Sequence, residues 1–298
     1  MNVKIIESEV EKLLKSDMIS VSNSSYSSPC LVVPKKDGSK RVVIDFRRIN
    51  AITIPENLPI PLVQDIFDRL SGCTYISLCD LCKGYNQCIL SPESRKYTAF
   101  MTKRTKYEWN VLAFGLRNAC GFFNRLMDMV LGHLPFVAYY FDDLVIFSQD
   151  FESHCKHIEQ VFNALEKANL KVNPDKCKFF ANKINLLGHV ISGKTIECDP
   201  AKIEAIIKRE PPRNVKELQI FLGCSGYYRN LIQNYAKHAK PLYDLVKKDT
   251  KFIWGEEQKI AFETLKKKLS EYPVLRMPVL DRQFLIYTDC SGYHIGAV

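Results

Sequence analysis

Two adjacent acids lie in the middle of an apolar segment, and this feature constrains the fold of the chain more than any other. The apolar runs 137–141 and 144–147 have the length of strands and meet at Asp142-Asp143. Burying two like charges side by side is costly unless a cation lies on them or they reach water at a turn. We therefore expect a β-hairpin with the acids at its turn. For an isolated pair of acids, an ordinary polar turn without a bound cation is the better explanation.

A third acid changes that assessment. Asp80 ends the apolar segment 75–79, so it also lies at the end of a predicted strand. Strands that end in Asp on a shared sheet can bring carboxylates to Mg²⁺, which takes oxygen ligands and keeps water and phosphate in the rest of its shell. Two such ions about 3.5 to 4 Å apart activate an attacking hydroxyl and stabilise the leaving oxygen of a phosphoryl displacement. The three acids therefore indicate nucleotidyl transfer.

The remaining pattern predicts an α+β protein with a helix-rich second half. Asp37-Gly38 between the apolar runs 30–33 and 41–44 predicts a hairpin with lysines at its tip. Further strands are expected at 74–78 and 284–288. Helical periodicity predicts helices at 5–16, 63–70, 121–131, 151–168, 200–208, 214–232, 237–247 and 256–270.

Composition suits a globular protein that binds a polyanion. The 298 residues, 46% of them hydrophobic, are enough for about two domains. The net charge of +9 suits a polyanionic partner such as nucleic acid, but many basic proteins with such a charge bind none. Basic residues cluster in one stretch, which an ordinary solvated hairpin would also explain: Lys35, Lys36, Lys40, Arg41, Arg47 and Arg48. No apolar run has membrane-spanning length and no signal segment is present, so we predict no membrane partner and an intracellular, cytoplasmic location.

Cysteines and histidines offer two weaker signals. The eleven cysteines are scattered without even spacing, which predicts reduced thiols. Cys79 and Cys82 flank Asp80 but have no second pair at zinc-binding spacing, so we interpret them as structural. His154 and His157 lie one helical turn apart without an acidic partner, and we predict that they are surface residues.

Taken in order, the motifs resemble those of the reverse transcriptase in the Pol polyprotein of gypsy-type long-terminal-repeat retrotransposons. The similarity covers nearly the whole chain. It rests on Asp80 with Gly84-Tyr85 and Gln87, Phe114-Gly115-Leu116-Arg117-Asn118-Ala119, Tyr140-Phe141-Asp142-Asp143, Leu187-Gly188-His189, Asn214-Val215-Lys216-Glu217-Leu218, Phe221-Leu222-Gly223, Tyr227-Tyr228-Arg229 and Tyr287-Thr288-Asp289.

The resemblance implies a right-hand polymerase with an antiparallel palm sheet. Residues 1–192 would form fingers and palm, 193–272 the thumb and connection, and 273–298 the truncated start of a ribonuclease H-like domain. The implied activity is RNA-directed and DNA-directed DNA polymerisation, in which deoxynucleotides are added to a primer 3′-OH with two Mg²⁺ ions, or Mn²⁺ in their place. The implied partners are an RNA or DNA template with its primer, deoxynucleoside triphosphates, and other Pol polyprotein domains or a second copy. An active element would place the protein in a virus-like particle.

The resemblance also implies roles for single residues. Asp80 and Asp142 would be direct metal ligands with Asp143 supporting them. Tyr85 matches the aromatic gate that excludes a ribose 2′-hydroxyl, although a buried core tyrosine is the alternative. The implied triphosphate contacts are Arg41 with Lys35 or Lys36, and the implied contacts to the nascent pair are Phe114 and Arg117.

Three further roles follow from the same resemblance. Leu187-Gly188-His189 would form the primer grip. Lys176, with Lys178 as second choice, would protonate the departing pyrophosphate, although a lysine among lysines is more often only solvated. Asp289 matches the first acid of a ribonuclease H site whose other acids are missing, so we expect no ribonuclease H activity from this chain.

The sequence departs from the family pattern beside the polymerase motifs. Ala113 and Cys120 stand where the family usually has proline, and Asn86, Phe122 and Asn124 also differ. These changes favour an alternative, a decayed or host-retained copy that binds primer and template without catalysis. A third hypothesis, an unrelated basic nucleic-acid binder, must treat all three acids as turn residues. The intact acids favour an active polymerase.

Overall fold

The computed structural model describes residues 2–34, 38–59, 61–271, 273–278, 283, 286, 288–290 and 295–297. Internal contacts divide the chain into two units. Unit 1 comprises Met1–Leu62 and Ser77–Phe180, and unit 2 comprises Val63–Ile76 and Ala181–Val298. Both contain helices and sheets, which confirms the predicted α+β class, whereas the predicted domain boundaries at 192 and 272 stay a prediction.

One sheet of unit 1 has the strand order β1-β6-β5-β2-β3. Its strands are β1 (Ile19–Val21), β2 (Ser28–Pro34), β3 (Lys40–Ile44), β5 (Phe100–Met101) and β6 (Lys106–Trp109). Helix α1 (Asn2–Lys15) packs Val10 against Ile19 and Phe100 of this sheet. Strands β2 and β3 pair as an antiparallel hairpin, as predicted. Lys35 and Lys36, which the sequence predicts at its tip, lie outside the described residues.

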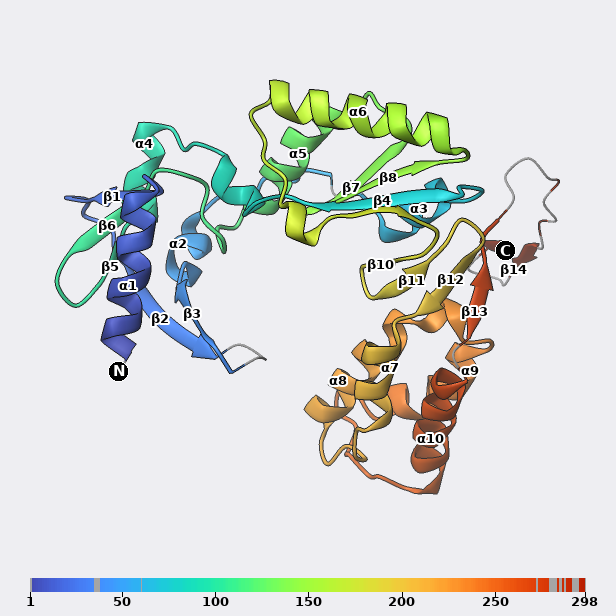
Figure 1. The fold of residues 1–298 in the computed structure, drawn as a ribbon. Helices are drawn as coiled ribbons and strands as arrows, with labels where there is room; N and C mark the ends of the chain where they lie inside the picture. The colour runs from blue at the N-terminus through green and yellow to red at the C-terminus, as the bar shows by residue number, and fades with distance from the viewer. Residues whose placement is uncertain are drawn as a thin grey trace. The chain divides into compact units, whose positions relative to one another are not determined.

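The second sheet of unit 1 has the order β7-β8-β4-β9 and carries the predicted acids. Helices α5 and α6 cover one of its faces (Figure 1). The apolar side chains beneath them form a core that includes Leu81, Phe123, Met127, Leu144, Ile146 and Val161. The elements are β4 (Tyr75–Asp80), β7 (Val137–Tyr140), β8 (Asp143–Ser148), β9 (Lys178–Ala181), α5 (Ala119–Leu131) and α6 (Phe151–Lys167), with the shorter α2 (Arg47–Ile52), η1 (Gly84–Gln87), α4 (Pro92–Arg95), η2 (Lys96–Thr98) and η3 (Pro174–Lys176) between them.

The surface prediction is wrong for His154, whereas His157 is partly buried. His154 is fully buried, because α6 lays this face on the sheet. Its Nε2 lies 2.8 Å from Ser77 Oγ and its Nδ1 2.7 Å from Ser148 Oγ, which also lies 2.8 Å from His157 Nδ1. Burial lowers the pKa of both imidazoles. Serine partners therefore satisfy a polar pair that periodicity alone assigned to solvent.

Unit 2 joins an antiparallel sheet to a group of helices. The sheet contains β10 (Ile184–Leu186), β11 (His189–Ile191), β12 (Thr195–Cys198) and β13 (Val274–Arg276), none of which the sequence predicted. The helices are α3 (Val63–Arg69), α7 (Pro200–Ile207), α8 (Val215–Tyr227), η4 (Arg229–Leu231), α9 (Tyr235–Asp244) and α10 (Glu256–Ser270). Figure 1 shows α7, α8, α9 and α10 gathered together, and the Phe221 and Phe262 rings meet in their core at 4.4 Å.

The last described segment is a short pair of strands. β14 (Thr288–Cys290) pairs antiparallel with β15 (Ile295–Ala297). The strand predicted at 284–288 overlaps β14 only at Thr288, and residues 284, 285 and 287 lie outside the described residues. None of the described helices is both long and apolar enough to cross a membrane.

Candidate active site

The predicted acids meet where a hairpin turn approaches the end of a neighbouring strand. Tyr140 pairs with Asp143 across β7 and β8, so Phe141 and Asp142 form a two-residue turn in which Phe141 has φ 54°. β4 lies beside β8 and ends at Asp80. The next amide, that of Leu81, donates to the Asp142 carbonyl at 3.3 Å. The turn and the strand end are therefore joined by backbone, which brings the three carboxylates together.

The carboxylates are short of positive charge. Burial raises the pKa of Asp142, and the charges of Asp80 and Asp143 raise it further. The pKa of Asp143 is raised by burial and then by Asp80. Asp142 Oδ1 is buried and accepts no hydrogen bond from the described residues. An unsatisfied buried acceptor costs about 1 to 3 kcal/mol, so this site favours a cation or donor from outside.

Lys176 supplies part of the missing charge. It ends η3, and its Nζ lies 3.1 and 3.2 Å from the two oxygens of Asp80. The amide of Asn173 donates to the Asp80 carbonyl at 2.8 Å and so fixes this segment beside β4. The Lys176 side chain is 62% exposed, and such an ion pair contributes at most about 1 kcal/mol. Lys178, the second predicted lysine, is exposed on β9.

The donor atoms fit a hard divalent cation, although they do not form a closed ligand set. Among the residues that the structure describes, no three His, Cys, Asp or Glu side chains are arranged to hold a metal ion. Three carboxylates, one with an unpaired oxygen, are nevertheless the ligand type that Mg²⁺ and Mn²⁺ take, with water and substrate oxygens completing the shell. The Lys176 ammonium lies against the Asp80 carboxylate where a metal ion would compete with it.

Gly84 leaves room for the Asp142 carboxylate. A Cβ built on Gly84 would overlap Asp142 Oδ1 and approach Phe123 Cζ to 2.9 Å. Gly84 begins η1 after Lys83, which has φ 49°. A glycine is therefore required here for close approach rather than for its dihedral angles.

Tyr85 is buried, with its ring between two phenylalanines. Its centroid lies 4.6 Å from that of Phe114 and 5.1 Å from that of Phe123, both edge to face. Its hydroxyl donates to Cys120 Sγ at 3.3 Å, and burial raises its pKa. The core-tyrosine alternative accounts for this packing. The gate hypothesis stays open because the Phe114 ring beside it is 44% exposed.

The other predicted nucleotide contacts lie in the same unit. The Arg41 guanidinium lies 5.6 Å from the centroid of Phe114, which gives a cation–π contact. Asn50, a residue that the sequence did not single out, accepts from the Arg117 amide at 2.9 Å and donates to the Gly115 carbonyl at 2.7 Å. Nothing in its local sequence marks Asn50, because its partners lie far along the chain.

The residues that depart from the family pattern have contacts of their own. Ala113 is fully buried, and Cys120 accepts the Tyr85 hydroxyl. Asn86 donates to the Leu112 carbonyl at 3.0 Å, and Asn124 donates to that of Pro59 at 3.1 Å, whereas Phe122 is half exposed. The ten cysteines whose side chains are described are free thiols, as predicted.

The predicted primer-grip residues lie in unit 2. Leu187 and Gly188 form the turn between β10 and β11, and His189 is buried at the start of β11. The backbone of Asp289 lies in β14, but its side chain falls outside the described residues.

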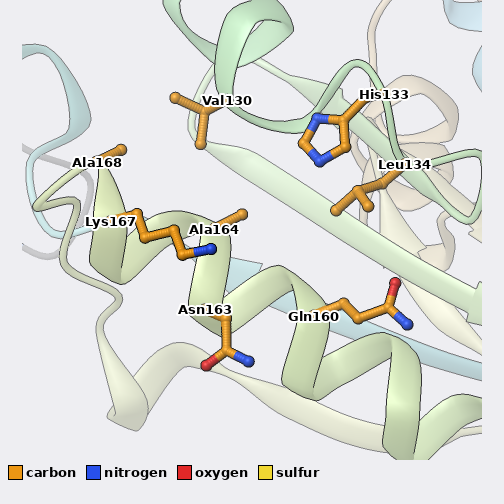
Figure 2. A pocket seen from close by; sticks show the side chains of 8 residues that line it. All are labelled: Val130, His133, Leu134, Gln160, Asn163, Ala164, Lys167 and Ala168. Atoms are coloured by element: carbon orange, nitrogen blue, oxygen red, sulfur yellow. The ribbon is translucent and has the colours of Figure 1, made fainter.

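A cavity of about 690 Å³ lies away from the acids, between the end of α5 and α6. Figure 2 shows Gln160, Asn163, Ala164 and Lys167 along α6, opposite Val130, His133 and Leu134. None of the predicted site residues lines this cavity, so its size does not mark the candidate active site.

Comparison with known proteins points to one family. Residues 33–191 match reverse transcriptase (RNA-dependent DNA polymerase), and residues 254–298 match an RNase H-like domain found in reverse transcriptase. The retrovirus-related Pol polyprotein from transposon 297 of Drosophila melanogaster is 41% identical over 301 residues, covering 98% of this chain and 28% of that protein. The retrovirus-related Pol polyprotein from transposon gypsy of the same organism is 36% identical, covering 98% of this chain and 30% of that protein. The chain thus spans less than a third of these relatives.

Solved structures agree with this result. The foamy viral protease-reverse transcriptase dRH in complex with double-stranded DNA has a TM-score of 0.88 at 25% identity, covering 96% of this chain and 51% of that one. The foamy viral protease-reverse transcriptase in complex with an RNA/DNA hybrid has a TM-score of 0.81 at 25% identity, covering 91% and 37%. The predicted polymerase fold and the predicted resemblance are therefore confirmed.

Proposed function

Because the chain belongs to the reverse transcriptase (RNA-dependent DNA polymerase) family, we propose that it copies RNA or DNA into DNA by adding deoxynucleotides to a primer 3′-OH. The observation that carries this proposal is the approach of Asp80, at the end of β4, to Asp142 and Asp143 at the β7–β8 hairpin, with Asp142 Oδ1 buried and without a hydrogen-bond partner among the described residues. A polar turn needs no such burial. A two-metal nucleotidyl transferase does need clustered carboxylates.

Divalent ions would be held by these three side chains. When bound, two Mg²⁺ or Mn²⁺ ions would activate the primer hydroxyl and stabilise the leaving pyrophosphate oxygen. Asp80 and Asp142 would be direct ligands. Asp80 ends β4 and Asp142 occupies the hairpin turn, and the hydrogen bond from the Leu81 amide to the Asp142 carbonyl joins the two segments. Asp143 begins β8, and its negative charge would support these two ligands.

Side chains of unit 1 would bind the incoming nucleotide. Arg41 would neutralise triphosphate oxygens, since a guanidinium forms strong charge-assisted hydrogen bonds with phosphate. Phe114 and Arg117 would pack against the nascent pair, with Asn50 holding the Arg117 backbone. The Tyr85 ring, fixed by Phe123 and Cys120, would exclude a ribose 2′-hydroxyl.

Lys176 would change partner during turnover. In the structure its ammonium neutralises Asp80. A cation bound to Asp80 would displace this ammonium, which could then donate a proton to the departing pyrophosphate. Half exposure suits such a movement, because a long solvated side chain loses little when it leaves its partner.

The proposed polymer partner is a primer annealed to a template. The two foamy viral proteins with similar folds were solved with double-stranded DNA and with an RNA/DNA hybrid. The net charge of +9 supports a polyanionic partner.

Primer extension tests the proposed function. The substrate is oligo(dT) on poly(rA) with TTP and Mg²⁺ or Mn²⁺, and the variant is Asp142→Asn. Asp150→Asn is the matched control, because Asp150 caps α6 through Ser153 and asparagine caps helices equally well. We expect the wild type and Asp150→Asn to extend the primer and Asp142→Asn to lose about 10³-fold in rate.

Other outcomes decide against parts of the proposal. Equal extension by the wild type and Asp142→Asn would remove the site assignment. Binding of the duplex with no extension by any variant would favour the decayed or host-retained copy. Binding without any requirement for divalent ions and with strong salt dependence would favour a simple phosphate-contacting protein.

A further inference from the structure

The turn between β10 and β11 is strained. Leu187 has φ 48° and Gly188 has φ 74°, and two successive positive φ values are those of a type I′ turn. Glycine adopts this conformation freely, and asparagine or aspartate usually precedes it. A leucine in that first position is sterically disfavoured and persists only where surrounding contacts fix it.

Two tyrosines supply those contacts. At the C-terminal end of α8, the Tyr227 hydroxyl donates to the Leu187 carbonyl and the Tyr228 hydroxyl donates to the Gly188 carbonyl at 2.8 Å. Tyr228 is buried, and the ring of His189 lies 5.1 Å from each tyrosine ring. One helix end therefore holds both carbonyl groups of the strained turn.

We propose that Tyr227 and Tyr228 are positioning residues for the primer strand: their hydroxyls hold the Leu187-Gly188 turn in the conformation that contacts the primer. This inference rests on the proposed function and on the resemblance of Leu187-Gly188-His189 to the primer grip of the family. A primer end must be held within about 1 Å of its productive position for efficient attack. A strained two-residue turn keeps such precision only while both carbonyl groups are fixed.

Removing the hydroxyls should loosen the turn without unfolding it. The Leu187 carbonyl oxygen also lies 3.2 Å from His189 Nδ1, and the Gly188 carbonyl also accepts from the Asp199 amide at 3.3 Å. Phenylalanine keeps the ring contacts of each tyrosine. Tyrosine-to-phenylalanine variants therefore leave no buried carbonyl without a donor.

The experiment compares Tyr227→Phe, Tyr228→Phe and the double variant with Tyr235→Phe. Tyr235 is the matched control, because its buried hydroxyl lies 3.0 Å from Ser225 Oγ and does not contact the turn. The readouts are the melting temperature, the Kd for a fluorescent primer–template by anisotropy, and the KM values for primer–template and TTP. We expect the double variant to raise Kd and KM for primer–template about tenfold, as for the loss of two hydrogen bonds, with KM for TTP unchanged. Tyr235→Phe should leave all of these binding values unchanged.

Two results would overturn the inference. Primer–template affinity equal to that of the wild type in the double variant would show that the hydroxyls are not needed. A lowered melting temperature with unchanged affinity would assign the tyrosines a structural role alone. The anisotropy measurement requires no turnover, so a wild type that binds but does not extend would contradict the proposed function and still test the positioning role.

Discussion

Two hairpin turns, one in each unit, begin with a residue at positive φ and differ in how their polar groups are satisfied. The Phe141-Asp142 turn and the Leu187-Gly188 turn each place a bulky residue at positive φ in the first position. In the first turn, Asp142 Oδ1 has no hydrogen-bond partner within the described part of the chain, and the charges of Asp80 and Asp143 act on it. In the second, tyrosine hydroxyls hold both carbonyls. The strained residue therefore lies beside an unsatisfied carboxylate oxygen in one turn and beside hydrogen-bonded carbonyl groups in the other.

The difference fits the two proposed roles: the carboxylate turn would bind divalent ions, and the Leu187-Gly188 turn would hold the primer by its fixed conformation. A buried acceptor without a donor lowers stability until a ligand supplies the missing charge, so the proposed function would complete the carboxylate turn with divalent ions. A turn whose carbonyl groups are all engaged gains nothing from a cation. It can serve only as a fixed surface.

After the loss expected for Asp142→Asn, the largest effect comes from removing the space beside the carboxylate turn. A Cβ in Gly84→Ala would displace the Asp142 carboxylate or the Phe123 ring. A displacement of about 1 Å at a reacting centre costs about 10²-fold in rate, and we expect that loss in kcat for primer extension. Gly223→Ala is the control, because its Cβ meets nothing within 4 Å. Normal turnover by Gly84→Ala would show that the observed position of Asp142 is not the reactive one.

The second effect concerns stability and divalent ions. A Mn²⁺ concentration 100 times the Kd should stabilise the wild type by about 2.7 kcal/mol, with no such gain for Asp142→Asn. Without ions Asp142→Asn should be the more stable protein, since it removes a charge from a carboxyl whose pKa burial has raised. Thermal denaturation with and without Mn²⁺ checks both signs. An equal gain in both proteins would place the ion elsewhere.

Two glycines separate strain from packing in unit 2. Gly188→Ala should lower the free energy of unfolding by about 1 kcal/mol, because alanine is disfavoured at φ 74°. Gly223 lies on the exposed side of α8. Gly223→Ala should raise the free energy of unfolding by up to about 1 kcal/mol, since alanine favours helix. Denaturant titration measures both. A cost as large for Gly223→Ala as for Gly188→Ala would contradict the strained turn.

The smallest expected effect is a pH dependence at the tyrosine-held turn. Burial lowers the pKa of His189 below 6.5. Its neutral form is therefore favoured by folding, so the stability of the turn is present above pH 6.5 and is lost as pH falls through the lowered pKa. Hydrogen exchange at residues 187–190, corrected for intrinsic rates, should show this loss in the wild type. His189→Phe should not show it, and an identical profile in both proteins would exclude His189 as the cause.

Local patterns predicted the palm hairpin well. The apolar runs around Asp142-Asp143 became β7 and β8, and the segment before Asp80 became β4. Alternating strands and the turn between them depend on neighbours in sequence, so the pattern is sufficient there. The same reasoning failed for His154, since the helical face was judged by its polarity while Ser77 and Ser148 satisfy it from the sheet.

The sequence did not predict the sheet of unit 2, for a different reason. β10, β11 and β12 have three or four residues each, too short for periodicity to register, and β13 reaches β12 from beyond α10. The motif Tyr227-Tyr228-Arg229 was recognised as part of the resemblance, but its partners were not. Only the position of α8 against the Leu187-Gly188 turn gives the tyrosines a role.

The sequence by itself determined the longer helices, the strands on either side of Asp142-Asp143 and before Asp80, and the chemistry of the three acids. The tertiary structure decided what each group meets, including the Lys176 ammonium on Asp80, the missing partner of Asp142 and the tyrosine hydroxyls on a strained turn. The physical reason is range. Secondary structure follows from neighbours within a few residues, whereas burial, charge balance and hydrogen-bond partners come from segments far apart in the chain.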